Sequence, residues 1–418
     1  MLFDPGRHEP LLPIAWDEAR VRAAIARVVA ETEAAFSPER YWPVHPRDLD
    51  PDDDAQQVST TLYFGACGVI WALHYLQSVG AATLARSYLG ELDLLLARNR
   101  ATLAGWESSD FASYLMGDTP ILMLAHGLQP DAATGDRLAE MMRGNVDHPA
   151  RELMWGAPGT MLAALFMHRR TGEARFAQLF REFAAKLWSQ LEWSAEHGCA
   201  YWTQDLYGQT STYLDAVHGF AATAFVLIAG RDLLPADAWT QWRQCIANTI
   251  SRIAVREGEH VNWSCWLERP GDRPNRSFLM QFCHGSPGFV ICLAAFPDDS
   301  LDALLAGAGE ATWAAGPLAK GSNLCHGTGG NGYAFLKLYR RTGDAMWLER
   351  ARAFAMHGIA QMEADARQHG RLRFSLWTGD PGFAIYLWDC LRGEAVFPTL
   401  DVFDASKASR EVRGLPAL

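Results

Sequence analysis

A short glycine motif recurs seven times along the chain, and each copy is followed by about a dozen almost wholly apolar residues. Two well-formed copies read GAPGTMLAALFMHRRTG and GTGGNGYAFLKLYRRTG. Copies two and four are degenerate, with Pro120 and Ala222 in the last turn position. The copies begin at Gly65, Gly117, Gly156, Gly219, Gly285, Gly327 and Gly379. Such a repeat indicates one supersecondary unit used many times, which limits the fold to a repetitive architecture.

Segments with the period of amphipathic helices separate the glycine copies. After the third copy, for example, Phe176, Leu179 and Phe183 share one stripe and the charged residues lie elsewhere. The segments cover residues 15–36, 81–101, 131–146, 173–193, 236–256, 298–316 and 344–367. A helix that is apolar on all sides must be buried, and an amphipathic helix can cover it.

The alternation predicts an all-α fold, an α/α toroid of seven inner and seven outer helices. We expect a single domain over residues 1–418, in which residues 1–60 supply one outer helix and the segment that leads to the first inner helix. No sheet is expected beyond short hairpins in the long loops. In such a toroid every glycine turn begins an inner helix, and the seven turns meet at one end of the barrel.

The stretch from Gly327 to Gly332 also matches the dinucleotide fingerprint G-x-G-x-x-G. No strand precedes it, and the same turn recurs in copies where the fingerprint fails, so we interpret it as a helix-starting turn. The chain carries a formal charge of -11 without a Lys/Arg run, which argues against nucleic acid as a partner. It has no signal-like N-terminus and no apolar run of the ~18 residues that span a membrane. We therefore expect a cytoplasmic protein with reduced thiols.

The residues directly before the glycines carry metal-ligand chemistry in three neighbouring copies. Cys283-His284 precedes copy five, Cys325-His326 precedes copy six, and His218 precedes copy four. Thiolate and imidazole ligands favour zinc, and Cys283, Cys325 and His326 would leave the fourth position open, as in catalytic sites. His218 and His284 remain further candidates for this position. We interpret the other cysteines as buried core residues: Cys67, Cys199, Cys245, Cys265, Cys292 and Cys390.

These motifs resemble the lanthionine synthetase C family, the LanC and LanC-like proteins, over nearly the whole chain. The most specific stretch, KGSNLCHGTGGNGYAFLKLY, is closer to the LanC-like branch. The resemblance implies an α/α toroid whose zinc is held by Cys283 of the fifth turn and by Cys325 and His326 of the sixth. It also implies catalytic roles for His218 and for Glu152, which stands four residues before the third-turn glycine.

The resemblance further implies a glutathione contact at Lys320, five residues before Cys325. Family members have another contact at an arginine before the seventh turn, where Arg371 or Arg373 stands in a shorter loop. The implied reaction is zinc-dependent addition of a thiol to dehydroalanine or dehydrobutyrine in a peptide or protein, with His218 as the acid. We favour glutathione as the thiol donor.

Three alternatives remain at this point. The thiol could come from a cysteine of the same precursor peptide, which makes the chain a lanthionine cyclase. The protein could be a non-catalytic, zinc-stabilised scaffold that binds peptides. It could also be an α/α-barrel carbohydrate enzyme, although such enzymes use carboxylates rather than thiolate metal sites.

Overall fold

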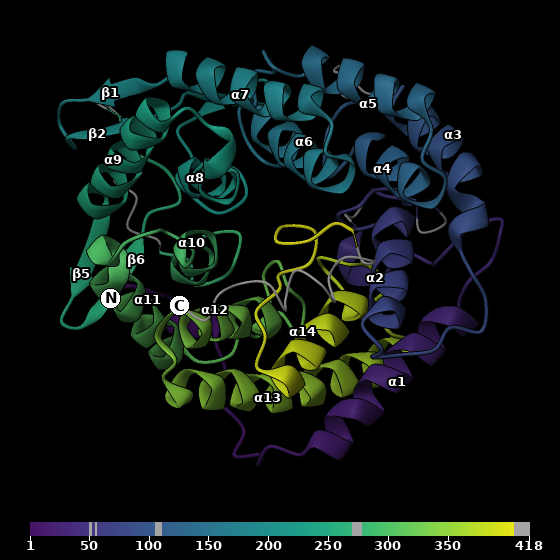
Figure 1. Cartoon of the computed structure of the whole chain (residues 1–418). Coiled ribbons are helices and arrows are strands. Elements are labelled where there is room, and N and C mark those ends of the chain that lie inside the picture. The colour runs from purple at the N-terminus through teal and green to yellow at the C-terminus, as the bar shows by residue number, and fades with distance from the viewer. Residues whose placement is uncertain (50–51, 55–56, 105–110, 270–277, 405–418) are drawn as a thin grey trace. The chain divides into compact units, whose positions relative to one another are not determined.

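The computed structural model describes the chain except for residues 50–51, 55–56, 105–110, 270–277 and 405–418. The last of these stretches belongs to the predicted domain and lies outside the described residues. The described part contains fourteen α-helices, three two-stranded sheets and short 3-10 helices (Figure 1). None of its helices has both the length and the apolar character needed to cross a membrane.

Each glycine copy begins a mostly buried helix, as the repeat predicts. The helix usually starts one residue after the first glycine, and that glycine is its N-cap in six of the seven copies. In the degenerate second copy, Asp118 takes this position instead. The helices are α2 Ala66–Ser78, α4 Thr119–Leu128, α6 Ala157–Thr171, α8 Phe220–Ala229, α10 Ser286–Leu293, α12 Thr328–Thr342 and α14 Asp380–Arg392.

The amphipathic segments form the alternate helices. Their apolar stripes are buried, as Phe176, Leu179 and Phe183 show in the fourth of them. These helices are α1 Glu18–Ala34, α3 Leu92–Leu103, α5 Ala132–Gly144, α7 Ala174–Ser189, α9 Ala236–Arg252, α11 Asp302–Ala315 and α13 Ala345–His369.

Three of the predicted helix boundaries are wrong. The segments at 173–193 and 236–256 end too late, because residues 192–194 and 254–257 form strands. The segment at 81–101 starts too early, because α3 begins only at Leu92. Residues 81–88 form bends and irregular backbone, in which the Ala85 amide donates to the Glu33 carboxylate at 2.9 Å. Gly90 then lies in a short 3-10 helix, Leu89–Glu91. Glycine is costly inside an α-helix, so the helix forms only beyond it.

The described residues group into two compact units. The first unit comprises residues 1–9, 112–114 and 136–316. In it α7 packs along α6, and α8 packs against both α6 and α10 (Figure 1). It also holds three antiparallel hairpins, which the sequence allowed for in its long loops: β1 Glu192–Ser194 with β2 Cys199–Tyr201, β3 Gln204–Leu206 with β4 Gln209–Ser211, and β5 Ala254–Glu257 with β6 His260–Trp263.

The second unit comprises residues 10–111, 115–135 and 317–418. Here α13 packs along α12, and α2 packs against α14 (Figure 1). The N-terminal helix α1 lies against α14, the last α-helix of the described chain. The expectation of a single domain over the whole chain stays a prediction.

Close backbone contact explains the first glycine in six of the seven copies, all but the degenerate second. A Cβ atom on Gly219 would lie 2.1 Å from the Asp215 amide nitrogen, and one on Gly156 would lie 2.8 Å from the Glu152 nitrogen. Contacts this short exclude any side chain. The glycines therefore serve the tight turn into the helix, which supports our interpretation of the fingerprint-like stretch.

Candidate functional site

A polar residue stands four positions before the first glycine in every copy, and we call this the capping position. Its side chain often binds the amides of the turn: Asp215 accepts from Val217 and His218, and Asn323 accepts from His326. Such local bonds fix the turn backbone. The capping residues are Thr61, Ser113, Glu152, Asp215, Gln281, Asn323 and Ser375. Of these residues, the resemblance predicts a functional role only for Glu152, although the pattern is visible in the sequence.

Glu152 and His218 form a hydrogen-bonded pair in the first unit. Glu152 is fully buried, accepts from the amides of Met154 and Trp155, and receives the His218 Nδ1 hydrogen at 3.0 Å. Burial opposes a charged imidazole, but the bond to Glu152 raises the pKa of His218 above its usual value. Because Nδ1 is held by the carboxylate, Nε2 is left to exchange a proton with a substrate.

Asp215 and His284 form a second pair of the same kind. The buried Asp215 carboxylate accepts from His284 Nδ1 at 2.7 Å. Burial disfavours the imidazolium, yet the nearby Asp215 charge raises the pKa of His284 to about 12. The His218 and His284 rings are 6.2 Å apart between centroids. The sequence motifs leave the role of His284 open and do not single out Asp215.

Cys283, next to His284, also lies in the first unit, in the turn before α10. Its side chain is buried, and its sulfur accepts a hydrogen bond from Gln281 Nε2 at 2.9 Å. The Gln281 oxygen accepts in turn from Arg7 at 3.1 Å. Arg7 therefore orients the amide that donates to this thiol.

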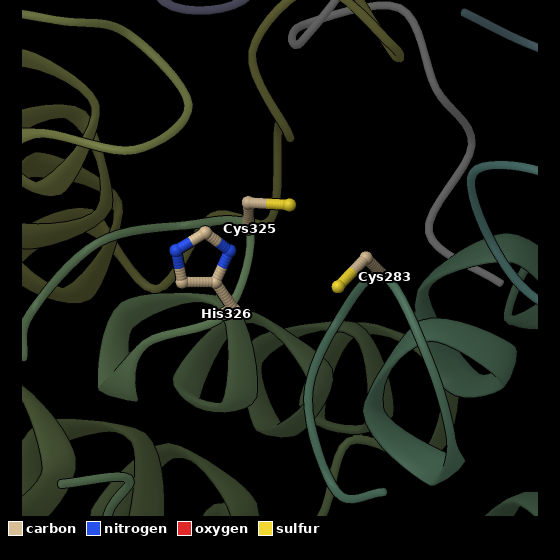
Figure 2. Close-up of side chains that lie close together, drawn as sticks. All are labelled: Cys283, Cys325 and His326. Carbon is tan, nitrogen blue, oxygen red and sulfur yellow. The ribbon is translucent and has the colours of Figure 1, made fainter. Parts of the chain in front are cut away.

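Cys325 and His326 lie in the second unit, in the turn before α12 (Figure 2). The Cys325 amide donates to the Trp377 carbonyl at 2.9 Å, and its sulfur accepts from the Tyr63 hydroxyl at 2.9 Å. The capping residue Asn323 holds the His326 amide at 3.0 Å. The seventh and first copies, which supply Trp377 and Tyr63, thus help to fix the sixth turn.

Cys283, Cys325 and His326 make up one candidate metal-ligand group, with two buried thiols and a partly buried imidazole (Figure 2). Two sulfur donors and one nitrogen donor match the preferences of zinc. A set of three protein ligands is also the number that catalytic zinc sites use. The donor chemistry therefore fits the metal that the sequence predicts.

The three candidate cations of the second unit differ in their surroundings. Lys320 is exposed, whereas Arg371 donates to the Val44 carbonyl at 2.7 Å. Arg373 is buried, and its guanidinium forms two hydrogen bonds with the Asp48 carboxylate, one of them at 2.7 Å from Nε. Arg373 thus joins its loop to the N-terminal segment, a contact for which the sequence gives no signal.

A further candidate group in the second unit contains His45, Asp365 and His369. His45 Nδ1 accepts from the Arg47 amide at 3.2 Å, so a neutral ring carries its proton on Nε2, the nitrogen nearer Asp365. Arg47 also pairs with the Asp365 carboxylate at 3.0 Å. A protonated Nε2 cannot bind a metal, and a cation already occupies the carboxylate. We interpret this group as a structural polar cluster.

The cysteines without an assigned role are free thiols, and all except Cys245 are buried. Burial raises the pKa of Cys67 and of Cys390, and it raises the pKa of Cys199 to about 11. Thiols of this kind are unreactive at neutral pH.

Comparison with known proteins agrees with the motifs. Residues 56–402 match the family described as lanthionine synthetase C-like protein. The chain is 27% identical over 395 residues to glutathione S-transferase LANCL1 of Danio rerio, covering 85% of this chain and 87% of that protein. It is 30% identical over 255 residues to LanC-like protein GCL1 of Arabidopsis thaliana, covering 57% of this chain and 54% of that protein.

Among solved structures, nisin cyclase is similar with a TM-score of 0.62 and 14% sequence identity. The likeness covers 94% of this chain and 98% of nisin cyclase. At this identity it shows the fold alone. Together with the family match, it confirms the fold class expected from the repeat, an α/α toroid.

Proposed function

Because the chain belongs to the lanthionine synthetase C-like family, we propose that it is an enzyme that adds a thiol to dehydroalanine or dehydrobutyrine residues of a peptide or protein. The observation that carries this proposal is the Glu152–His218 pair, at 3.0 Å, in the same compact unit as a candidate zinc ligand, Cys283. A thiol addition needs an activated sulfur and a proton donor, and these residues have the chemistry for both.

Activation of the thiol is assigned to Cys283, Cys325 and His326 as zinc ligands. Two facts support the set: all three stand in the one or two positions before the glycine of their copies, and their donor atoms suit zinc. A bound zinc would make a coordinated substrate thiol a thiolate at neutral pH. Gln281 and Tyr63 each donate a hydrogen bond to one of the two cysteine sulfurs, at 2.9 Å, which holds the sulfur in place.

Protonation is assigned to His218. When the thiolate sulfur bonds to the β-carbon, the electron pair of the carbon–carbon double bond moves toward the carbonyl and leaves an enolate. The α-carbon must then receive a proton, and His218 Nε2 is the donor. Glu152 fixes the ring through Nδ1, and the raised pKa of His218 favours the protonated form that this step requires.

Glutathione is the thiol donor that we favour. Its two carboxylates call for a cation, and Lys320 is exposed five residues before Cys325. One similar protein carries the name glutathione S-transferase, which supports the same choice. All eight cysteines of this chain are free thiols, as expected in the reducing cytoplasm, where glutathione is abundant.

A cysteine of the same peptide is the second candidate donor, favoured by the structural likeness to nisin cyclase. A peptide-binding scaffold without activity would need Glu152 to fix its turn, but it would not need the bond between Glu152 and His218. The carbohydrate alternative has no support, since the chain belongs to a different family.

One experiment separates these functions. The protein is incubated with glutathione and a dehydroalanine peptide, and in parallel with a peptide that carries both dehydroalanine and cysteine. We expect the first peptide to gain the mass of one glutathione faster than in a reaction without protein. Ring closure in the second peptide alone, seen as loss of its free thiol, would identify a cyclase. If the protein accelerates the reaction of neither peptide, the non-catalytic, peptide-binding scaffold is the function that remains.

A further inference from the structure

The loop of the β3–β4 hairpin has an unusual backbone for its sequence. Leu206 pairs with Gln209, so Tyr207 and Gly208 alone form the loop, with φ angles of 55° and 74°. Two-residue loops with two positive φ angles favour Asn-Gly, because most side chains disfavour the left-handed region. Tyrosine is thus a poor choice for forming this hairpin.

The Tyr207 side chain is also unusually exposed for an aromatic ring, at 70%. Its position is nevertheless fixed, because its hydroxyl accepts from Trp155 Nε1 at 2.7 Å and the two rings meet edge to face at 6.1 Å. Trp155 is buried, directly precedes the third-copy glycine, and donates its amide to Glu152. The exposed ring is therefore anchored to the turn that carries Glu152.

The base of the hairpin is fixed to the turn that carries His218. The buried Gln204 side chain donates to the His218 carbonyl at 2.7 Å and accepts from the Tyr213 amide at 2.7 Å. With its tip bound to Trp155 and its base bound to the His218 carbonyl, the hairpin ties Tyr207 to the two turns that carry the proposed acid–base pair.

We propose that Tyr207 is a substrate-contact residue whose exposed ring packs against the dehydrated acceptor peptide. This inference rests on the proposed function. Dehydroalanine is planar and uncharged, and an aromatic face offers it a broad apolar contact with few rotatable bonds to order. Backbone strain that folding does not need is typical of functional positions. Glutathione is small and carries two carboxylates, so its binding does not depend on this ring.

The test compares Tyr207→Asn with wild type. Asparagine tolerates left-handed backbone, which offsets the loss of the hydrogen bond from Trp155, so the variant should melt close to the wild-type temperature. Its KM for the dehydroalanine peptide should rise about ten-fold, the loss of one aromatic contact, while its KM for glutathione changes by less than about two-fold. Tyr207→Phe keeps the ring and should retain most of the peptide affinity. A matched control is Trp193→Ala, which removes another exposed hairpin aromatic, 63% exposed, and should leave both KM values unchanged.

Binding without turnover separates this inference from the proposed function. Fluorescence anisotropy of a labelled dehydroalanine peptide should show about ten-fold weaker binding to Tyr207→Asn than to wild type, whether or not a thioether forms. Equal affinities would overturn the contact and make Tyr207 a structural residue. A wild type that binds the peptide through Tyr207 but forms no thioether would refute the proposed function and leave the contact standing.

Discussion

His284 donates from Nδ1 to the Asp215 carboxylate across 2.7 Å. One repeat earlier, His218 makes the same bond to Glu152 across 3.0 Å. In each pair the carboxylate occupies the capping position of one copy and the histidine directly precedes the glycine of the next. The repeat therefore builds one carboxylate–imidazole unit twice, with His284 beside a proposed zinc ligand and His218 beside none in its own turn.

Removing His218 should slow the reaction without removing zinc. His218→Ala is expected to lower the rate of thioether formation by about 10²–10⁴-fold, the usual contribution of a general acid. Glu152→Gln should slow it less, because the amide still accepts a hydrogen bond but no longer favours the charged ring. Steady-state kinetics and elemental analysis of the same samples decide the point. His197→Ala, another partly buried histidine of the first unit, is the control. Loss of zinc in His218→Ala would instead show that His218 is a zinc ligand.

The Asp215→Asn variant should separate the contribution of the Asp215–His284 pair from that of the Glu152–His218 pair. The asparagine oxygen can still accept from the amides of Val217 and His218, but its NH₂ group faces His284 Nδ1, which must then accept. We expect turnover to fall roughly ten-fold, with the melting temperature and zinc content kept. In a double-mutant cycle with His284→Ala, the two effects should not add, because they act through one hydrogen bond. Additive losses of turnover would show that Asp215 acts only through the turn that carries His218, and not through its bond to His284.

Zinc content should depend on the cysteine in the sixth turn. Cys325→Ala is expected to reduce bound zinc from about one per chain to a small fraction, because two protein ligands rarely hold zinc firmly. Cys67→Ala, which removes a buried thiol of α2, is the control and should keep its zinc. Elemental analysis of purified, folded proteins measures both. Full zinc in Cys325→Ala would refute the proposed ligand set.

Lys320 should matter for glutathione more than for the acceptor peptide. Lys320→Ala is expected to raise the KM for glutathione about three- to ten-fold, as for loss of one partly solvated charge contact. Ring closure in a peptide that carries its own cysteine should change less. Lys320→Arg keeps the charge and serves as the comparison. The assignment fails if both thiol donors respond equally to Lys320→Ala.

His45 should make the fold sensitive to mild acid. Burial lowers the pKa of His45 to about 4, whereas a histidine in the unfolded chain titrates near 6.5. Between these values the unfolded chain binds more protons, so stability falls as the pH drops from about 6.5 to 4. Across this range the melting temperature should decline less in His45→Asn than in wild type. The asparagine side chain can still accept a backbone hydrogen bond at this place but cannot titrate. Parallel curves for the two proteins would contradict the prediction.

The helices and candidate zinc ligands could be predicted because their signals are local. Period, glycine spacing and the residues before each glycine are all visible within a single copy, so Cys283 and His326 stand out without any structure. The start of α3 was missed because Gly90 and the bond from Ala85 to Glu33 outweigh the helical period there.

The residues that contact the predicted site residues are harder to predict, because they come from distant segments of the chain. Either Arg371 or Arg373 is the candidate glutathione contact, and the Arg373 guanidinium lies against Asp48, 325 residues earlier in the chain. No local pattern links the two. Asp215 is an intermediate case, since comparison of the capping positions of all copies would have placed it beside Glu152 as an equivalent residue.

The contact between α1 and α14 has a consequence for how the polypeptide acquires its structure during synthesis. The apolar face of α1, with Val21, Ile25 and Val28, leaves the ribosome long before its partner α14, Asp380–Arg392. This face must therefore remain uncovered until α14 has been synthesised, and contacts between such distant segments form slowly. Nascent chains of this protein should thus depend on chaperones that shield α1 until α14 emerges.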